Sequence, residues 1–299
     1  MSHTNPPSVL SVLLNRVQSL QDEQKHTEAA ISAQTAIETG RRTVETDPEA
    51  TPHLITALEM LGNLRRESGD YPDAERLYLE ALQLAEKSDI PVSQIARLKC
   101  SLAAVYDFSQ LPESAIPLYQ QSIELFENMD PPAELDVANL CNNLGMIYKE
   151  EGNFEQAETH YLRALEILER VSGNNNVDVA GVYNNLGALY QSSNYNGQAR
   201  EMYNQALEIH KEVSDPDHPD LGQSHGNLAT VLHELGENEQ ALKNYQTAMR
   251  ILEANLSEDA KTFSIVVANF ASLMRDMGKE RKALSIEKRA SKILRRCSA

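Results

Sequence analysis

The sequence predicts an all-α protein, a solenoid in which pairs of antiparallel helices are repeated in tandem. A short asparagine-leucine motif recurs every 42 residues, and columns of alanine accompany it at fixed offsets. Glycine, which disfavours helix interiors, is scarce, with 13 among 299 residues. A repeated unit of this size cannot bury its apolar face alone, so neighbouring units must stack to form one continuous core.

The period is set by a motif in the first half of each unit. Asn143-Leu144-Gly145 recurs 42 residues later as Asn185-Leu186-Gly187, and the third and fourth copies begin at Asn227 and Asn269. We expect two regions. Residues 1–50 form a divergent helical hairpin that caps the array, and residues 51–299 form six units of 41–42 residues ending in a basic capping helix.

Residues 136–171 illustrate the unit. Its first half places Leu140, Leu144 and Ile147 at spacings of three and four, which is one face of a helix. Gly152 interrupts the pattern. Its second half repeats the helical spacing from Phe154 to Leu168 and ends at Ser172-Gly173, where we expect a left-handed C-cap.

Small residues mark the predicted contact lines between helices. The second helix of each unit carries Ala74, Ala115, Ala157, Ala199, Ala241 and Ala283 in one column, and seven residues later Ala81, Ser122, Ala164, Ala206, Ala248 and Ala290. Between the two columns lie Tyr78, Tyr119, Tyr161, Tyr203 and Tyr245. Helices approach closely only where side chains are small, so each tyrosine ring should fill the space beside its small pair. Tyr106, Tyr148 and Tyr190, on the first helices, are likewise predicted to pack in the core.

The two ends depart from this template. Residues 8–46 carry an apolar stripe from Val9 to Leu20, and Ala29 and Ala36 repeat the seven-residue spacing of small residues. In the last unit Glu287 replaces the tyrosine. Terminal repeats are expected to differ because one of their faces meets water.

This pattern resembles the tetratricopeptide repeat (TPR). Leu144-Gly145 with Tyr148, then Ala157, Tyr161 and Ala164, follows that family's motif. The 42-residue length, the Asn-Asn-Leu-Gly segments and Asp217-His218-Pro219-Asp220 are similar to the kinesin-light-chain subclass. The resemblance implies a right-handed superhelix whose first helices line a concave groove. It also implies a non-catalytic scaffold or adaptor for protein binding.

Composition limits the function further. The net charge is −17, which repels phosphate and argues against nucleic-acid binding. The three cysteines form no CxxC pair, so we expect no zinc site and no disulfide framework, and reduced thiols fit a cytoplasmic location. The apolar stretch from Val9 to Leu14 is too short to span a membrane. No catalytic motif is found, so we expect no enzyme activity, no metal and no cofactor.

The candidate binding site is a ladder of asparagines on the first helices. Asn143, Asn185, Asn227 and Asn269 occupy the same position in successive units. An amide both donates and accepts, so a row of them can pair with successive peptide groups of an extended chain in the groove. Their predicted companions are Asn139, Asn142, Asn184, Lys149, Gln223 and Thr230. The alternative is that these asparagines form hydrogen bonds between adjacent repeats.

Charges beside the ladder are mixed. The basic side chains are Arg66, Arg97, Lys149 and Arg275, and the acidic ones are Glu59, Glu67, Asp107, Glu150 and Glu234. We therefore expect a peptide partner that is neutral or of mixed charge. A second hypothesis is an assembly or regulatory factor held to an anionic surface, whether nucleic acid, lipid or acidic protein. Its contacts would be Arg289, Lys292, Arg295 and Arg296 on the C-terminal helix.

Overall fold

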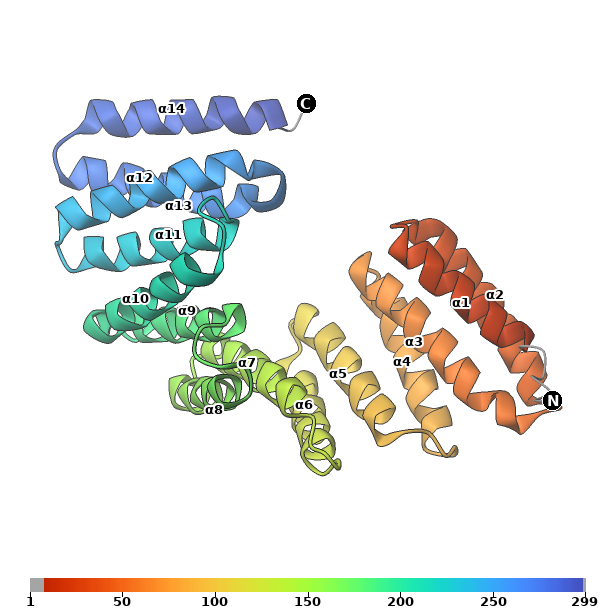
Figure 1. The fold of residues 1–299 in the computed structure, drawn as a ribbon. Helices are drawn as coiled ribbons and strands as arrows, with labels where there is room; N and C mark the ends of the chain where they lie inside the picture. Colours follow the sequence, from red (N-terminus) through yellow and green to blue (C-terminus); the bar gives the residue numbers. More distant parts are fainter. Residues whose placement is uncertain (1–7, 298–299) are drawn as a thin grey trace. The chain divides into compact units, whose positions relative to one another are not determined.

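The computed structural model describes residues 8–297, except for the side chains of residues 257–259, 296 and 297. Residues 1–7 and 298–299, the outer ends of the predicted cap and repeat regions, lie outside the described residues. The described part folds into fourteen α-helices and contains no strand, which confirms the predicted all-α class (Figure 1).

The helices divide into two compact units, residues 1–140 and residues 141–299. The first unit contains α1 (Val9–Asp22), α2 (His26–Val44), the 3₁₀ helix η1 (Pro48–Ala50), α3 (Thr51–Glu67), α4 (Tyr71–Ala85), α5 (Val92–Phe108) and α6 (Pro112–Glu127). Helix α7 (Glu134–Glu150) begins in it and continues into the second. The second unit contains α8 (Phe154–Ser172), α9 (Val177–Ser192), α10 (Asn196–Val213), α11 (Pro219–Glu234), α12 (Asn238–Ala254), α13 (Leu256–Asp276) and α14 (Glu280–Cys297).

Within each unit, helices form hairpins and each hairpin packs on the next. Helix α3 pairs with α4, α9 with α10, α11 with α12, and α13 with α14. Helix α10 also contacts α11, and α12 contacts α13, so consecutive hairpins share one apolar core (Figure 1). None of the described helices is long and apolar enough to cross a bilayer.

Every hairpin turn has the same backbone geometry. Each contains one residue with a positive φ, and these residues are Gln24, Gly69, Gln110, Gly152, Asn194, Gly236 and Gly278. The next residue donates its N–H back across the turn, as Asn153 does to the Tyr148 carbonyl at 2.8 Å. This is the Schellman arrangement, which satisfies carbonyls that a helix end would leave unpaired. The predicted cap at Gly173 also has a positive φ, 81°, but its ψ of 164° lies outside the left-handed helical region.

The columns of small residues lie where the sequence predicts. The alanines of both columns, from Ala74 to Ala290, are at most 3% exposed. A Cβ placed on Gly145 would lie 2.6 Å from the ring of Tyr161, and Gly187 has the same relationship to Tyr203. The tyrosine rings therefore rest directly on the backbone of the first helix, and a larger residue in that column would displace them.

The ends of the chain use the same packing in modified form. Helices α1 and α2 form a hairpin on α3, in which Val17, Ala29 and Ala36 are fully buried. At the other end, the Glu287 carboxylate stands in the tyrosine column and accepts a hydrogen bond from Arg275 at 2.7 Å. A charged group is tolerated there because this side of α14 is partly open to solvent.

A candidate peptide-binding face on the first helices of residues 141–299

The first helices of the second unit carry the predicted asparagine ladder. We call the ladder and its neighbours the first-helix face, and it comprises Asn142, Asn143, Met146, Lys149, Asn184, Asn185, Ala188, Gln191, Gln223, Asn227, Thr230, His233, Asn269, Ser272 and Arg275. They belong to α7, α9, α11 and α13, at helical spacings of three and four that place them along one stripe of each helix. Asn139, the remaining predicted residue, lies exposed on α7 in the first unit.

Two of the four ladder asparagines bridge neighbouring repeats. The Asn185 side chain donates to the Oδ1 of Asn142, one repeat earlier, at 2.8 Å. Asn269 donates to the hydroxyl of Thr230 at 3.2 Å, also one repeat earlier. At these two positions the amide donor is used inside the protein, which corresponds to the alternative considered for the ladder.

Thr230 is fully occupied. Its hydroxyl donates to the Gly226 carbonyl at 3.0 Å and accepts from both Asn269 and Tyr245, each at 3.2 Å. A hydroxyl has one proton and two lone pairs, so Thr230 has no capacity left for a ligand.

The other two ladder asparagines are in a different state. Asn143 and Asn227 are half-buried, and neither side chain forms a hydrogen bond with another described residue. Each amide therefore keeps its donors and acceptor available at the surface of the first-helix face. Lys149 is half-buried on α7, and Gln223 is exposed on α11.

Asn184 points between two repeats. Its Nδ2 donates to the Ser224 hydroxyl at 3.3 Å, and that hydroxyl is 2.8 Å from Nδ1 of the buried His210. Burial lowers the pKa of His210, so the imidazole is neutral in this network. The Oδ1 of Asn184 is buried without a hydrogen-bond partner among the described residues.

The polar side chains of the face also pair from repeat to repeat. Gln191 donates to Glu234 at 2.7 Å, and His233 lies 2.9 Å from Asp276. Each pair is separated by 43 residues, as are Asn142 and Asn185. These pairs join consecutive helices of the face.

The tyrosines beneath the face reveal a feature that the sequence analysis missed. The hydroxyl of Tyr203 donates to Gln191 at 3.0 Å, and that of Tyr245 donates to Thr230 at 3.2 Å. The hydroxyl of Tyr161 is buried and has no hydrogen-bond partner in the described structure. Burial raises the pKa of Tyr161, so the hydroxyl keeps its proton and remains a donor.

The reason for the unpaired Tyr161 hydroxyl is visible in the repeat. The positions that supply acceptors at the other tyrosines, Thr230 and Gln191, correspond to Met146 and Lys149 on α7. A methionine thioether is only a weak acceptor, and an ammonium accepts nothing. The presence of Met146 and Lys149 at the acceptor positions can be seen by aligning the repeats. Its effect on the Tyr161 hydroxyl can be seen only from the packing of the helices.

Tyr148, like Tyr106 and Tyr190, is half-buried, so the prediction that these three tyrosines pack in the core is only partly right. Tyr106 and Tyr190 pack against the edge of the buried core. Their hydroxyls donate to Glu75 and Glu158 on the preceding second helices. Burial, and then the hydrogen bond to Glu158, raises the pKa of Tyr190 to about 12. These two tyrosines link consecutive hairpins on the side of the second helices.

The basic residues of α14 are not equivalent. All three described side chains are exposed, but Arg289 pairs with Glu253 of α12 at 2.7 Å, whereas Lys292 and Arg295 form no ion pair with another described residue. The side chain of Arg296 lies outside the described residues. Across the described residues, no group of three histidine, cysteine or acidic side chains has a geometry that would hold a metal ion.

Comparison with known proteins identifies the repeat. The sequence profile of the tetratricopeptide repeat matches residues 53–128, 136–212 and 196–254. The crystal structure of BtubC (BKLC) from P. vanneervenii is 30% identical, with a TM-score of 0.65, over 83% of this chain and 92% of that chain. Curated protein sequences give no significant match.

Two further structures share the fold at lower identity. A putative kinesin light chain of P. anserina with nearly identical TPR-like repeats is 16% identical, with a TM-score of 0.56, over 68% of this chain and 96% of that chain. The apo form of RapI is also 16% identical, with a TM-score of 0.68, over 96% of this chain and 76% of that chain. The predicted resemblance to kinesin-light-chain-like repeats is thus confirmed.

Proposed function

Because the chain belongs to the tetratricopeptide repeat family, whose fold is a scaffold for protein–protein interaction, we propose that it is a non-catalytic adaptor that binds an extended peptide segment of a partner. The peptide lies along the first-helix face of residues 141–299. Asn143 and Asn227 pair with the peptide backbone, while Asn185 and Asn269 hold adjacent repeats together.

The observation that carries this proposal is the division within the asparagine ladder. Two amides are used for bonds between repeats, and two in the same column form no hydrogen bond with any other residue that the structure describes. Asparagine is a poor helix former, so an unpaired copy in a helix interior gains nothing from its position alone. An amide that pairs with a peptide group of a bound chain would explain why it stands there.

The Tyr161 hydroxyl supports the same assignment. A buried donor without an acceptor costs roughly 1–3 kcal/mol, and a backbone carbonyl of a bound peptide would remove that cost. Met146 and Lys149 lie at the acceptor positions, and both are flexible side chains that can turn aside when a peptide binds. The free chain would then hold an unsatisfied group that is satisfied only in the complex.

The chemistry of the face favours an uncharged or mixed-charge peptide. Its acidic neighbours Glu234 and Asp276 are already paired with Gln191 and His233. Lys149 remains as a cation beside the unpaired Tyr161. One acidic side chain near Lys149, in an otherwise neutral segment, is the expected pattern.

The experiment compares two pairs of asparagines. A peptide is selected on the wild-type protein from a phage-displayed library, and its affinity is measured by fluorescence anisotropy. We expect Asn143→Ala combined with Asn227→Ala to weaken binding by about tenfold or more, equivalent to about 1.4 kcal/mol, with little change in Tm. Asn185→Ala combined with Asn269→Ala is the matched control, and it should lower the Tm because it removes bonds between repeats.

Two results would contradict the proposal. One is a selected peptide that binds the Asn143 and Asn227 variant as tightly as the wild type. The other is a selected peptide whose protection footprint in hydrogen exchange lies on the second helices. The combined Asn185→Ala and Asn227→Ala variant should give an intermediate result, with both a lower Tm and weaker binding.

A further inference from the structure

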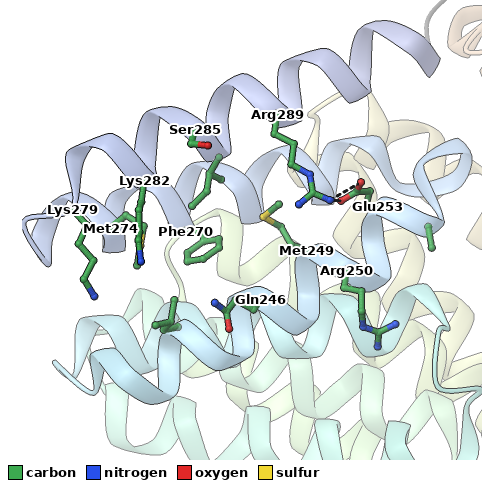
Figure 2. A pocket seen from close by; sticks show the side chains of 13 residues that line it. Gln246, Met249, Arg250, Glu253, Phe270, Met274, Lys279, Lys282, Ser285 and Arg289 are labelled. Carbon is green, nitrogen blue, oxygen red and sulfur yellow. Dashed lines mark hydrogen bonds and ion pairs between the residues drawn. The ribbon is translucent and has the colours of Figure 1, made fainter.

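A groove between α12 and α14 in the second unit has an apolar floor and a basic rim. Its volume is about 860 Å³. Met249, Phe270 and Met274 form the floor, and Figure 2 shows Phe270 between Lys279 and Lys282 at one end and Arg289 at the other. We call it the terminal groove, because the last two second helices form its walls.

The equivalent groove one repeat earlier is crossed by polar bridges. It lies between α10 and α12, with a volume of about 580 Å³. Arg200 of α10 forms an ion pair with Glu237, which precedes α12, at 2.8 Å. His225 of α11 forms a hydrogen bond with Asn244 of α12 at 2.7 Å. These two contacts cross a groove that is smaller than the terminal groove.

Both bridges are absent from the terminal groove because the residues that form them have changed. The equivalent positions lie 42 residues later and carry other residue types. Leu242 and Lys279 correspond to Arg200 and Glu237. Val267 and Ile286 correspond to His225 and Asn244. A leucine cannot pair with a lysine. The four replacements thus remove these two bridges, and two of them, Leu242 and Ile286, add apolar side chains to the lining.

The charge of the groove is also reversed. Four basic side chains and one acidic side chain line the terminal groove, whereas two basic and three acidic side chains line the preceding one. Glu208 and Gln240 of the preceding groove correspond to Arg250 and Lys282. This basic site lies in a chain whose net charge is −17.

Only some of these cations are available. Arg289 is bound to Glu253 at 2.7 Å, and Arg250 to Asp217 at 2.6 Å (the first pair is dashed in Figure 2). Lys279 contacts only the sulfur of Met277, at 3.9 Å, and Lys282 has no ion pair in the described structure. The free positive charge is therefore concentrated at the end of the groove beside the α13–α14 turn.

We propose that the terminal groove binds an acidic peptide segment of a partner protein. A bulky apolar side chain of the segment packs against Leu242 and Ile286 above the buried floor, and its carboxylates pair with Lys279 and Lys282. Exposed lysine–carboxylate pairs contribute little by themselves, so the apolar contact supplies much of the affinity and the lysines select the charge. This site is separate from the first-helix face.

A peptide fits these features better than nucleic acid or a lipid surface. A polyphosphate or a membrane needs a broad row of exposed cations and gains nothing from an enclosed apolar floor. Here the floor lies within a groove, two of its four cations are already neutralised, and the rest of the chain is acidic.

The test uses the full chain and a fluorescein-labelled peptide with a central leucine and phenylalanine flanked by glutamates. A peptide with lysines in place of the glutamates is the probe for charge. Lys279→Glu with Lys282→Gln restores the residues of the preceding repeat, and we expect it to weaken binding by at least about tenfold. A second variant, Leu242→Arg with Lys279→Glu, rebuilds the bridge seen between Arg200 and Glu237 and should weaken binding to a similar extent.

The matched control is Lys288→Glu with Lys292→Gln. It changes the charge of α14 by the same amount, at exposed positions outside the groove lining. We expect this control to weaken binding by less than about twofold, because only a screened long-range attraction is lost. Circular dichroism at 222 nm verifies that each variant retains its helices.

Three outcomes would overturn the proposal. The first is the absence of saturable binding of the acidic peptide to the wild type. The second is an equal loss of binding affinity in the groove variant and in the α14 control. The third is displacement of the peptide by phosphatidylserine vesicles or a DNA oligonucleotide at equal charge. Asn143→Ala with Asn227→Ala should leave binding of this probe unchanged. Failure of the terminal groove is therefore distinguishable from failure of the first-helix face.

Discussion

Gly187 and Tyr203 are so close that a Cβ placed on Gly187 would lie 2.6 Å from the tyrosine ring. The two residues belong to α9 and α10, the two helices of one hairpin. Tyr203 is buried, and its hydroxyl is fixed by Gln191, so the ring has little freedom to move aside. The distance between the two helices therefore depends on the size of the side chain at position 187.

Substitution of Gly187 by alanine should destabilise the protein. Overpacking of a core costs roughly 1–3 kcal/mol, and the higher helix propensity of alanine offsets up to about 1 kcal/mol of this. Ala229 holds the same column opposite Tyr245, so the packing can adapt. We therefore expect a net loss of about 1 kcal/mol in the free energy of unfolding, measured by urea denaturation.

Gly181 provides the control for this prediction. It lies on the same helix, and a Cβ placed there meets no atom within 4 Å. Gly181→Ala should stabilise the protein by about 0.5–1 kcal/mol through helix propensity alone. If both alanine variants were stabilising, the ring of Tyr203 would not be in the position described.

The packing columns explain why so much of the fold is predictable from the sequence. Gly145 and Tyr161 are 16 residues apart, and the corresponding small residue and tyrosine have the same separation in the comparable units. A contact between a small residue and a ring needs only those two residue types at that separation. The use of each ladder asparagine is different. Asn185 and Asn227 share residue type and column, and each has an asparagine 43 residues earlier, yet only Asn185 forms a hydrogen bond with it in the described structure. Asn184, the residue 43 positions before Asn227, donates to Ser224 instead. That outcome depends on distances between repeats, which the sequence does not contain.

The terminal groove shows the same limit. In the sequence, Lys279 and Lys282 appear only as members of the basic C-terminal segment. Their position on the rim of an apolar groove depends on the loss of the bridge that Arg200 and Glu237 form one repeat earlier. A comparison of the repeats position by position could have found that loss.

Removal of the Tyr161 hydroxyl should be harmless or favourable to stability. Tyr161→Phe deletes a buried donor without a partner, so the free energy of unfolding should stay the same or rise by up to about 1 kcal/mol. Tyr245→Phe deletes a donor that is bound to Thr230 and should cost about 0.5–1.5 kcal/mol. Chemical denaturation of both variants checks the difference. A larger loss for Tyr161→Phe than for Tyr245→Phe would show that the Tyr161 hydroxyl has a partner.

The hairpin turns predict a stabilising substitution. Gln110 has a φ of 58°, a left-handed conformation that costs a residue with a side chain about 1–2 kcal/mol. Gln110→Gly relieves that strain but adds entropy to the unfolded chain, so we expect a net gain of about 0.5–1 kcal/mol. Gly152 has a φ of 74° in the corresponding turn, and a Cβ there would meet no atom within 4 Å. Gly152→Gln should therefore cost a similar amount, and thermal unfolding of the pair checks that the two changes are opposite in sign.

Two histidines, His210 on α10 and His225 on α11, make the stability of the protein depend on pH. Nδ1 of His210 lies 2.8 Å from the Ser224 hydroxyl, and Nδ1 of His225 lies 2.7 Å from Oδ1 of Asn244. The Asn244 amide is oriented by its own bond to the Gln240 carbonyl, so His225 is the donor in that contact. Burial is the main cause that lowers the pKa of both histidines.

The protein should lose stability as the pH falls below the ordinary histidine pKa of about 6.5. Below that value the unfolded chain binds protons at His210 and His225, while the folded chain keeps both imidazoles neutral. The unfolded state then binds more protons, so the free energy of unfolding decreases with falling pH, and above about pH 7 these groups contribute no slope. Urea denaturation at pH 7.5, 6.5 and 5.5 measures the change. His210→Gln, which keeps a polar group next to Ser224 but cannot titrate, should flatten the dependence, and an unchanged slope in that variant would assign the effect to other groups.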